Sequence, residues 1–243
     1  MRRAPTAGPD LGVYVQAIPL LVRNPSIIVI PLLMAVIGVL MGLVLSPYGG
    51  GGIGQATTGL AGFILQMLQL FGLGAACVIA DDAWRNGHAS FERGWSEARR
   101  RGSDLLMAAL GVAIVTSLAQ FVAVLVGSLI ALVLGLVIYV FLIWAMPAAA
   151  VGGIPGGAAI GVSVERVRET PVPAVLTAII AFALTYVTVR YASPYLTQLL
   201  LPYLGGATIV NSLIDALLRA IAAGYIALIV TRTYTGTAFT RRW

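Results

Sequence analysis

The chain has 243 residues, of which 59% are hydrophobic and 10% are charged, and its formal net charge at pH 7 is +6. All 15 basic residues are arginine, which excludes a lysine Schiff base for retinal or pyridoxal phosphate and also a Walker A phosphate loop. A single cysteine and a single histidine exclude an internal disulfide, a Cys/His zinc cluster and bis-histidine haem, so we expect no metal, no cofactor and no enzymatic activity.

The stretch from Leu105 to Val151 contains no charged side chain, and the mean hydropathy of the chain is +0.96. A bilayer's hydrocarbon core is crossed by about 20 apolar helical residues, so this stretch predicts two spans joined by a tight turn. Hydrocarbon cannot satisfy a free backbone amide, and the spans are therefore helical. We predict an all-α polytopic membrane protein, a six-helix bundle in which residues 1–243 form a single domain.

The six spans are taken in chain order. They cover approximately residues 26–45, 57–80, 103–126, 129–150, 172–192 and 208–231. Each is long enough to cross the bilayer. The third and fourth spans divide the uncharged stretch near Gly127 and Ser128.

Three further stretches are expected to form short helices in the membrane interface. They are Leu11–Arg23, Ser90–Arg101 and Gly156–Arg168. In the second, apolar residues recur every three or four positions opposite arginine and glutamate, which is typical of an amphipathic surface helix. Ser90 is expected to cap its start, because a serine hydroxyl can accept a free amide of the first turn.

The arginines predict the orientation of the chain. A six-span topology places all of them except Arg190 and Arg219 on one side of the membrane. The opposite connections, Pro47–Ala56 and the turn at Gly127 and Ser128, carry no charge. The positive-inside rule therefore predicts that both termini are cytoplasmic. No cleaved signal peptide is expected.

Asp215 and Arg219 are the sharpest candidate pair, because their spacing places them on one face of the sixth span. Placing an ionisable group at this depth of the bilayer costs free energy, and such groups usually serve a function. We hypothesise that the pair belongs to a polar cavity open to the outside, able to hold a small polar or anionic group. The other side chains assigned to it are Arg190, Gln66, Gln120 and Asn211, with Gln69 as a further candidate. The alternative is that the pair neutralises itself and the amides form packing contacts between helices.

Two carboxylates, Asp81 and Asp82, lie at the end of the second span, where they oppose the helix macrodipole. Arg85 lies within reach of them, and Arg23 or the cluster Arg99–Arg101 could also pair with them. We interpret these groups as an interfacial ion-pair network. A cation site is the alternative.

The second amphipathic stretch combines an aromatic residue with consecutive cations: Trp95, Arg99, Arg100 and Arg101. This composition predicts contact with anionic lipid headgroups on the cytoplasmic face, each cation contributing about 1 kcal/mol. Nucleic-acid binding is not expected.

Small residues recur at fourfold spacing on three spans. They are Gly38 and Gly42 on the first, Gly127, Ala131 and Gly135 on the fourth, and Ala216, Ala220 and Gly224 on the sixth. Such residues let helix backbones approach closely. They predict packing within the chain, with another copy, or with a partner protein.

A weak internal repeat relates two of the interface segments. With a shift of 67 residues, Ala83, Gly94, Ser96, Arg99 and Arg101 align with Ala150, Gly161, Ser163, Arg166 and Arg168. A repeated unit of span, surface helix and span is one interpretation, as found in transporters. Chance similarity between two arginine-containing surface helices is the other.

Short motifs resemble those of bacterial multi-span membrane families of unknown function, related to the membrane domain of some glycerophosphodiester phosphodiesterases. They are Arg23-Asn24-Pro25-Ser26 and the segment from Pro147 through Gly153 with Ala158, Ser163 and Arg166. The resemblance implies a six-span bundle of the bacterial cytoplasmic (inner) membrane. It implies no catalytic residues, because the phosphodiesterase chemistry belongs to a separate soluble domain.

We therefore expect a non-enzymatic inner-membrane protein that acts as a structural or accessory subunit, or scaffold, of a membrane complex. The alternative is a transporter or binding protein for a lipid or small amphipathic solute. The two differ in geometry. A scaffold predicts that Asp215 and Arg219 are packed shut, whereas a transporter predicts a cleft that reaches them.

Overall fold

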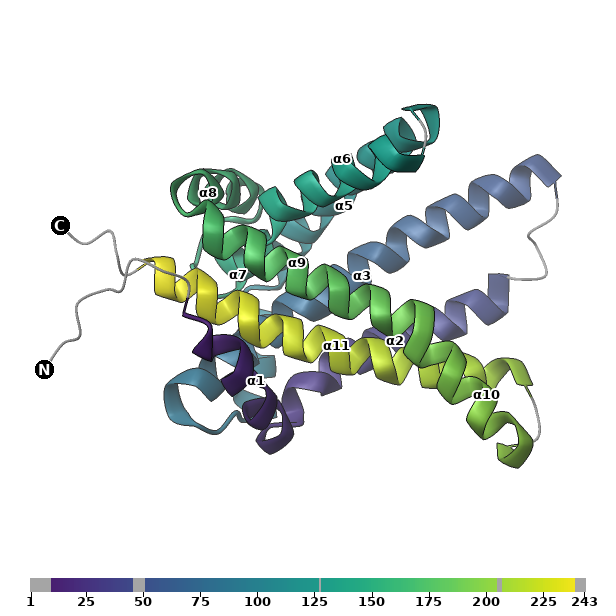
Figure 1. The fold of residues 1–243 in the computed structure, drawn as a ribbon, viewed down its shortest axis with the longest axis horizontal. Helices are drawn as coiled ribbons and strands as arrows, with labels where there is room; N and C mark the ends of the chain where they lie inside the picture. Colours follow the sequence, from purple (N-terminus) through teal and green to yellow (C-terminus); the bar gives the residue numbers. More distant parts are fainter. Residues whose placement is uncertain (1–9, 46–50, 127, 205–206, 239–243) are drawn as a thin grey trace, which may run out of the picture.

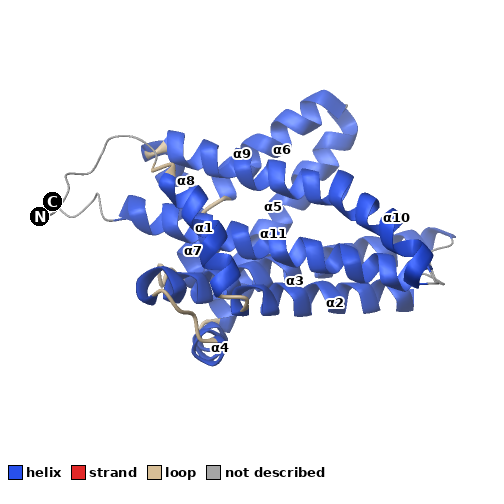
Figure 2. Cartoon of the chain, turned by 60° about the horizontal axis from the view of Figure 1, so that its bottom comes forward, coloured by secondary structure: helices blue, strands red, loops and turns tan. Residues whose placement is uncertain are grey.

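The structure is a computed structural model that describes residues 10–45, 51–126, 128–204 and 207–238. This part of the chain is helical throughout, with short connections and no strand (Figures 1 and 2). In chain order the elements are α1 (Gly12–Arg23), α2 (Ser26–Leu45), α3 (Gly51–Asn86), α4 (Phe91–Arg100), α5 (Gly102–Val126), α6 (Ser128–Leu142), α7 (Ala145–Ala150), α8 (Gly156–Glu169), α9 (Pro171–Val187), the π-helical turn η2 (Thr188–Ala192), α10 (Ser193–Leu204) and α11 (Ala207–Ala238).

The predicted all-α six-span architecture is confirmed. Six helical segments of the described chain are long and apolar enough to cross a membrane: Ser26–Val44, Gly59–Asn86, Gly102–Val122, Val133–Ala150, Pro171–Leu200 and Ile209–Gly236. The fifth helical segment extends beyond the predicted end near residue 192, as far as Leu200. The helix continues through the π-helical turn η2 and past Pro194 into α10.

The three predicted interface segments are the short helices α1, α4 and α8, and each is followed by a pair of spans (Figure 1). All three gather at one end of the bundle, which we call the short-helix end (Figure 2). The first residues of α1 and the last residues of α11 lie at this same end. Ser90 caps α4 as predicted, since its hydroxyl accepts the Arg93 amide at 3.5 Å.

Helix α11 lies in the middle of the bundle and packs chiefly on α2 and α3. Several of the predicted small residues make these contacts. Ala216 and Ala220 are buried, and a Cβ at Gly224 would lie 3.1 Å from Ile28. A Cβ at Gly38 would overlap Leu65 of α3. These positions therefore serve packing within the chain.

The remaining small residues are placed differently. A Cβ at Gly42 or Gly135 would have no atom within 4 Å among the described residues. Gly127 lies outside the described residues, and so does the side chain of Ala131. Gly42 and Gly135 thus mark open positions on α2 and α6.

The fourth span is interrupted at Ile143 and Trp144, between α6 and α7. Ser163 of α8 fills the break, since its hydroxyl donates to the Phe141 carbonyl at 2.7 Å and accepts the Trp144 amide at 3.2 Å. Trp144 is fully buried, and its indole N–H donates to the Thr233 hydroxyl at 3.1 Å. The break therefore ties α8 and α11 to the fourth span.

The two segments related by the 67-residue shift share a layout but not their surroundings. Each short helix, α4 and α8, follows one span and precedes the next. However, Gly94 is buried whereas the aligned Gly161 is exposed, and Ser96 is exposed whereas the aligned Ser163 is buried. The alignment therefore does not pair residues of equivalent environment.

Candidate functional site

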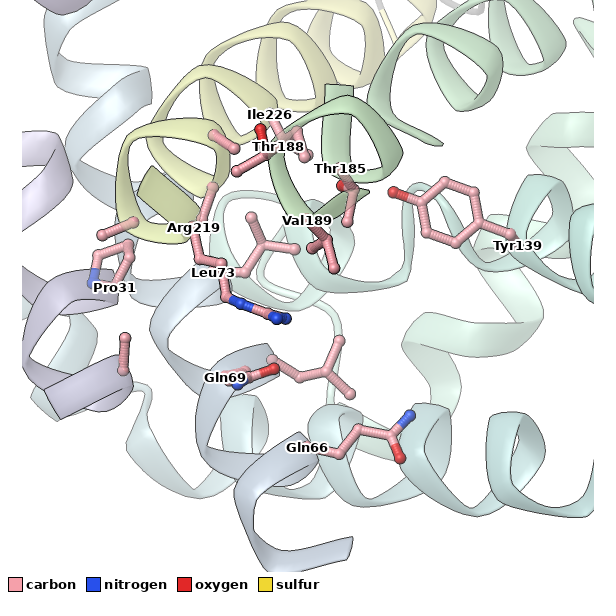
Figure 3. Close-up of a pocket in the computed structure, with 15 residues that line it drawn as sticks. Pro31, Gln66, Gln69, Leu73, Tyr139, Thr185, Thr188, Val189, Arg219 and Ile226 are labelled. Atoms are coloured by element: carbon pink, nitrogen blue, oxygen red, sulfur yellow. The ribbon is translucent and has the colours of Figure 1, made fainter. Parts of the chain in front are cut away.

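A cavity of about 260 Å³ lies among helices α2, α3, α6, α9, η2 and α11 (Figure 3). Its polar lining residues are Gln66, Gln69, Tyr139, Thr185, Thr188 and Arg219. Its apolar lining residues are Pro31, Ala35, Leu70, Leu73, Val189, Ala220, Ala222, Ala223 and Ile226. The site thus offers hydrogen-bonding groups beside an apolar wall, which is the general character of small-molecule sites.

The cavity lies within the membrane-spanning part of the bundle. At a rise of 1.5 Å per residue, Arg219 is about 15 Å along α11 from Ile209, where that span begins. Gln66 lies about 10 Å along α3 from Gly59, at the corresponding end of its own span. The polar groups are therefore in the half of the bundle away from the short helices, at a depth where hydrocarbon surrounds the protein.

Arg219 forms the predicted ion pair with Asp215, with Nε and Oδ2 2.6 Å apart. The pair is not packed shut, since 42% of the Arg219 side chain and 31% of the Asp215 side chain are exposed. Only Nε of the guanidinium is engaged by Asp215. Its terminal nitrogens extend toward Gln69 in the cavity and donate no hydrogen bond to any described residue (Figure 3). Asp215 therefore orients a guanidinium whose outer edge faces the cavity.

Three other lining residues also hold unused hydrogen-bonding capacity. Gln69, Tyr139 and Thr188 make no side-chain hydrogen bond within the described part of the chain, although Thr188 is only 7% exposed. Thr185 differs, because its hydroxyl donates to the Ala181 carbonyl at 2.9 Å. These polar atoms border the open space of the cavity, so water or a bound ligand can hydrogen-bond to them there.

The structure brings together only part of the predicted polar site. Gln66 lines the cavity and donates to the Thr116 hydroxyl at 2.5 Å. Arg190 and Gln120 are exposed and do not line it, so their assignment to the cavity is wrong. Arg190 lies in the π-helical turn, two residues beyond Thr188, which places it about 200° from Thr188 around an α-helix and so on the side away from the cavity. Gln120 lies on the far half of α5, where the α5–α6 pair diverges from α3 (Figure 1).

Asn211 is likewise outside the cavity, contrary to the prediction. It is half-buried on α11, and its Oδ1 is a buried acceptor that no described residue satisfies. At 100° per residue it lies within about 80° of Arg219 around the helix. Asn211, Asp215 and Arg219 therefore form a polar stripe that leads along α11 from its first turns to the cavity.

Tyr139, Thr185 and Thr188 line the cavity but were not predicted. Their hydroxyls are ordinary residues of apolar spans, and hydropathy does not reveal which spans are neighbours. For Thr188 a signal does exist, because a π-helical turn is favoured just before a proline that cannot donate a backbone hydrogen bond. That Tyr139 and Thr185 line the same cavity follows only from the packing of the helices.

The amphipathic helix α4 arranges its predicted lipid-contact residues in two ways. Arg99 lies over the Trp95 ring at 5.7 Å and stays exposed. Arg100 and Arg101 each bond Glu97 at 2.8 Å, and these hydrogen bonds, that from Arg100 foremost, lower the pKa of the Glu97 carboxyl. Arg101 also donates to a backbone carbonyl of α7, that of Ala150, at 3.0 Å. Arg101 therefore bonds mainly to other residues of the protein rather than facing the lipid headgroups.

The carboxylates at the end of α3 form the predicted ion-pair network. Asp81 pairs with Arg85 at 2.8 Å. Asp82 pairs with Arg93 at 3.5 Å and accepts a 2.6 Å hydrogen bond from Asn86. The described residues contain no group of three potential metal ligands. Arg93, rather than Arg23 or the cluster Arg99–Arg101, supplies the second cation.

The chain was compared with protein-family models, curated proteins and solved structures, and nothing matches it. The resemblance to membrane domains of glycerophosphodiester phosphodiesterases therefore stays a prediction. The candidate site rests on its own geometry: an integral membrane bundle with a polar cavity at Arg219.

Proposed function

We propose that this integral membrane protein binds, and transports or presents, a lipid or small amphipathic solute with an anionic headgroup. The observation that carries the proposal is the unsatisfied polar lining of the cavity. Arg219, Gln69, Tyr139 and Thr188 hold free donors and acceptors inside the membrane-spanning part. The terminal nitrogens of a guanidinium suit bidentate binding of a carboxylate or phosphate.

The geometry favours this function over a purely structural role. A scaffold needs the ion pair only as a packing contact, and such a pair would be enclosed by neighbouring side chains. Here Arg219 and Asp215 are both partly exposed, and Arg219 borders the cavity. The apolar wall formed by Leu70, Leu73 and Ile226 would receive the hydrocarbon part of the ligand.

Binding of dodecyl phosphate to the purified protein in nanodiscs, measured by native mass spectrometry, tests the proposal. Arg219→Leu removes a charge-assisted contact, worth roughly 1.5–3 kcal/mol, so affinity should fall about 10- to 100-fold. Arg190→Leu is the matched control, because it removes an exposed cation that does not line the cavity. Equal affinities for the two variants would refute the proposal, as would a fully folded wild-type protein that binds no probe.

The accessory-subunit role is a second candidate, favoured by the open positions at Gly42 and Gly135. Small residues on an unoccupied helix face would admit a partner helix or a second copy of the chain. Gentle extraction into nanodiscs, followed by size analysis and mass spectrometry, separates the two functions. A polypeptide at a fixed ratio would establish a subunit role, and its loss in Gly42→Leu would place the contact on α2.

We also propose that the short-helix end faces the cytoplasm of a bacterial inner membrane. Apart from Arg190 and Arg219, the described arginines lie on α1, on α8 and at the α3–α5 and α11 ends that meet there. The positive-inside rule supports this orientation. Arg99 and Trp95 of α4 would then contact anionic headgroups of that leaflet. Glycosylation-site insertion or reporter fusions at the connections would test the topology.

A further inference from the structure

The π-helical turn η2 alters the backbone at the wall of the cavity. The Ser193 amide donates to the Thr188 carbonyl, five residues earlier, rather than to the Val189 carbonyl four residues earlier. The next residue, Pro194, has no N–H to donate. The Val189 carbonyl therefore receives neither the fourth-neighbour nor the fifth-neighbour amide that a helix would supply.

Side-chain positions show the same widened winding. The rings of Tyr186 and Tyr191 are five residues apart, yet their centroids are 6.1 Å apart in an edge-to-face contact. In an α-helix, five residues turn through about 500°, which would separate the two rings by about 140° around the axis. In the π-helical turn, residues five apart, rather than four apart, therefore lie on the same side of the helix.

This turn supplies candidate acceptors to the cavity that holds the Arg219 donors. Val189 and Thr188 both line the cavity, and the Thr188 hydroxyl makes no hydrogen bond to a described residue. An unbonded carbonyl within a membrane span is costly, and interrupted helices of transporters use such carbonyls to bind their substrates. The cavity is therefore lined by a cationic donor on α11, Arg219, and by two residues of η2, Thr188 and Val189, that can offer neutral acceptors (Figure 3).

We propose that the ligand carries a hydrogen-bond donor, such as a primary ammonium or a hydroxyl, close to its anionic group. This inference rests on the proposed function and narrows it. The anionic group binds the Arg219 guanidinium, and the donor binds the Val189 carbonyl and the Thr188 hydroxyl. The substrate class is that of amphiphiles with a phosphoethanolamine-like or hydroxylated acidic headgroup.

The native protein provides the first test. Short-chain phosphatidylethanolamine and phosphatidylcholine with the same two acyl chains share a phosphodiester anion and have no free hydroxyl, and only the former carries a hydrogen-bond donor, its ammonium group. Native mass spectrometry of the protein in nanodiscs should show about tenfold tighter binding of the ethanolamine lipid. Equal affinity for the two lipids would overturn the inference and leave the proposed function intact. Binding of neither lipid nor dodecyl phosphate would overturn both.

Substitutions distinguish the acceptors from a steric preference for the smaller headgroup. Pro194→Ala restores an N–H that can bond the Val189 carbonyl. The ratio of the affinities for the ethanolamine and the choline lipid should therefore fall toward one. Pro171→Ala is the matched control, because Pro171 begins α9, where a missing N–H has no consequence. Thr188→Val removes only the hydroxyl and should lower the preference with little effect on folding. An unchanged preference in both the Pro194 and the Thr188 variants would overturn the inference.

Discussion

Ser163→Ala should be strongly destabilising, because the Ser163 hydroxyl satisfies two backbone groups at the break in the fourth span. Without it, the buried Trp144 amide and the partly buried Phe141 carbonyl lose their hydrogen bonds to Ser163. A buried unsatisfied group costs about 1–3 kcal/mol, and because the Phe141 carbonyl is only partly buried we expect a total loss of about 2–4 kcal/mol. For a chain of this size, that corresponds to a Tm lowered by roughly 5–15 °C.

Ser96→Ala is the control for this prediction. Ser96 is exposed, and its hydroxyl bonds only the Arg93 carbonyl of its own helix, so its loss should change stability by no more than about 0.5 kcal/mol. Thermal unfolding of both variants in a mild detergent, followed by circular dichroism, gives the comparison. Similar Tm values for Ser163→Ala and the wild type would refute the role assigned to the hydroxyl.

Three further predictions concern other parts of the bundle. The pKa of Glu97 is lowered by its hydrogen bond from Arg100, so this contribution to α4 stability is complete above the ordinary value of 4.5 and is lost as pH falls through the lowered pKa. Amide exchange in α4 should therefore accelerate in acid, and Glu97→Gln should abolish this pH dependence. Gly94→Ala should cost about 1–3 kcal/mol, because a Cβ there would overlap the Ile79 side chain; an unchanged Tm would contradict this. Cys77 is fully buried, so a maleimide should label it only on unfolding, and rapid labelling of the folded protein would contradict the packing of α3.

The positions of the spans could be predicted from the sequence because hydrocarbon imposes length and composition locally. The stretch around Leu105–Val151 has no charge, and its division into two spans follows from bilayer thickness alone. The pair Asp215 and Arg219 was visible for the same reason, since four-residue spacing within one helix needs no tertiary information.

The composition of the cavity could not be predicted, because it depends on which helices are neighbours. Tyr139 reaches the cavity from α6, yet nothing in the surrounding apolar residues distinguishes it from an interfacial tyrosine. Arg190 was assigned to the cavity from its depth alone, but it is exposed and does not line the cavity. The break at Trp144 was also hidden, since its stabilising hydroxyl comes from Ser163 on another helix.

The ion pair between Asp215 and Arg219 has an electrical consequence. Its charges cancel, so the empty cavity carries no net charge in the field across the membrane. A purely anionic ligand would add one negative charge, whose transfer across 100 mV changes its free energy by about 2.3 kcal/mol. A ligand that also bears an ammonium group would leave the loaded cavity neutral. The dependence of transport on membrane voltage would therefore report the charge of the natural ligand.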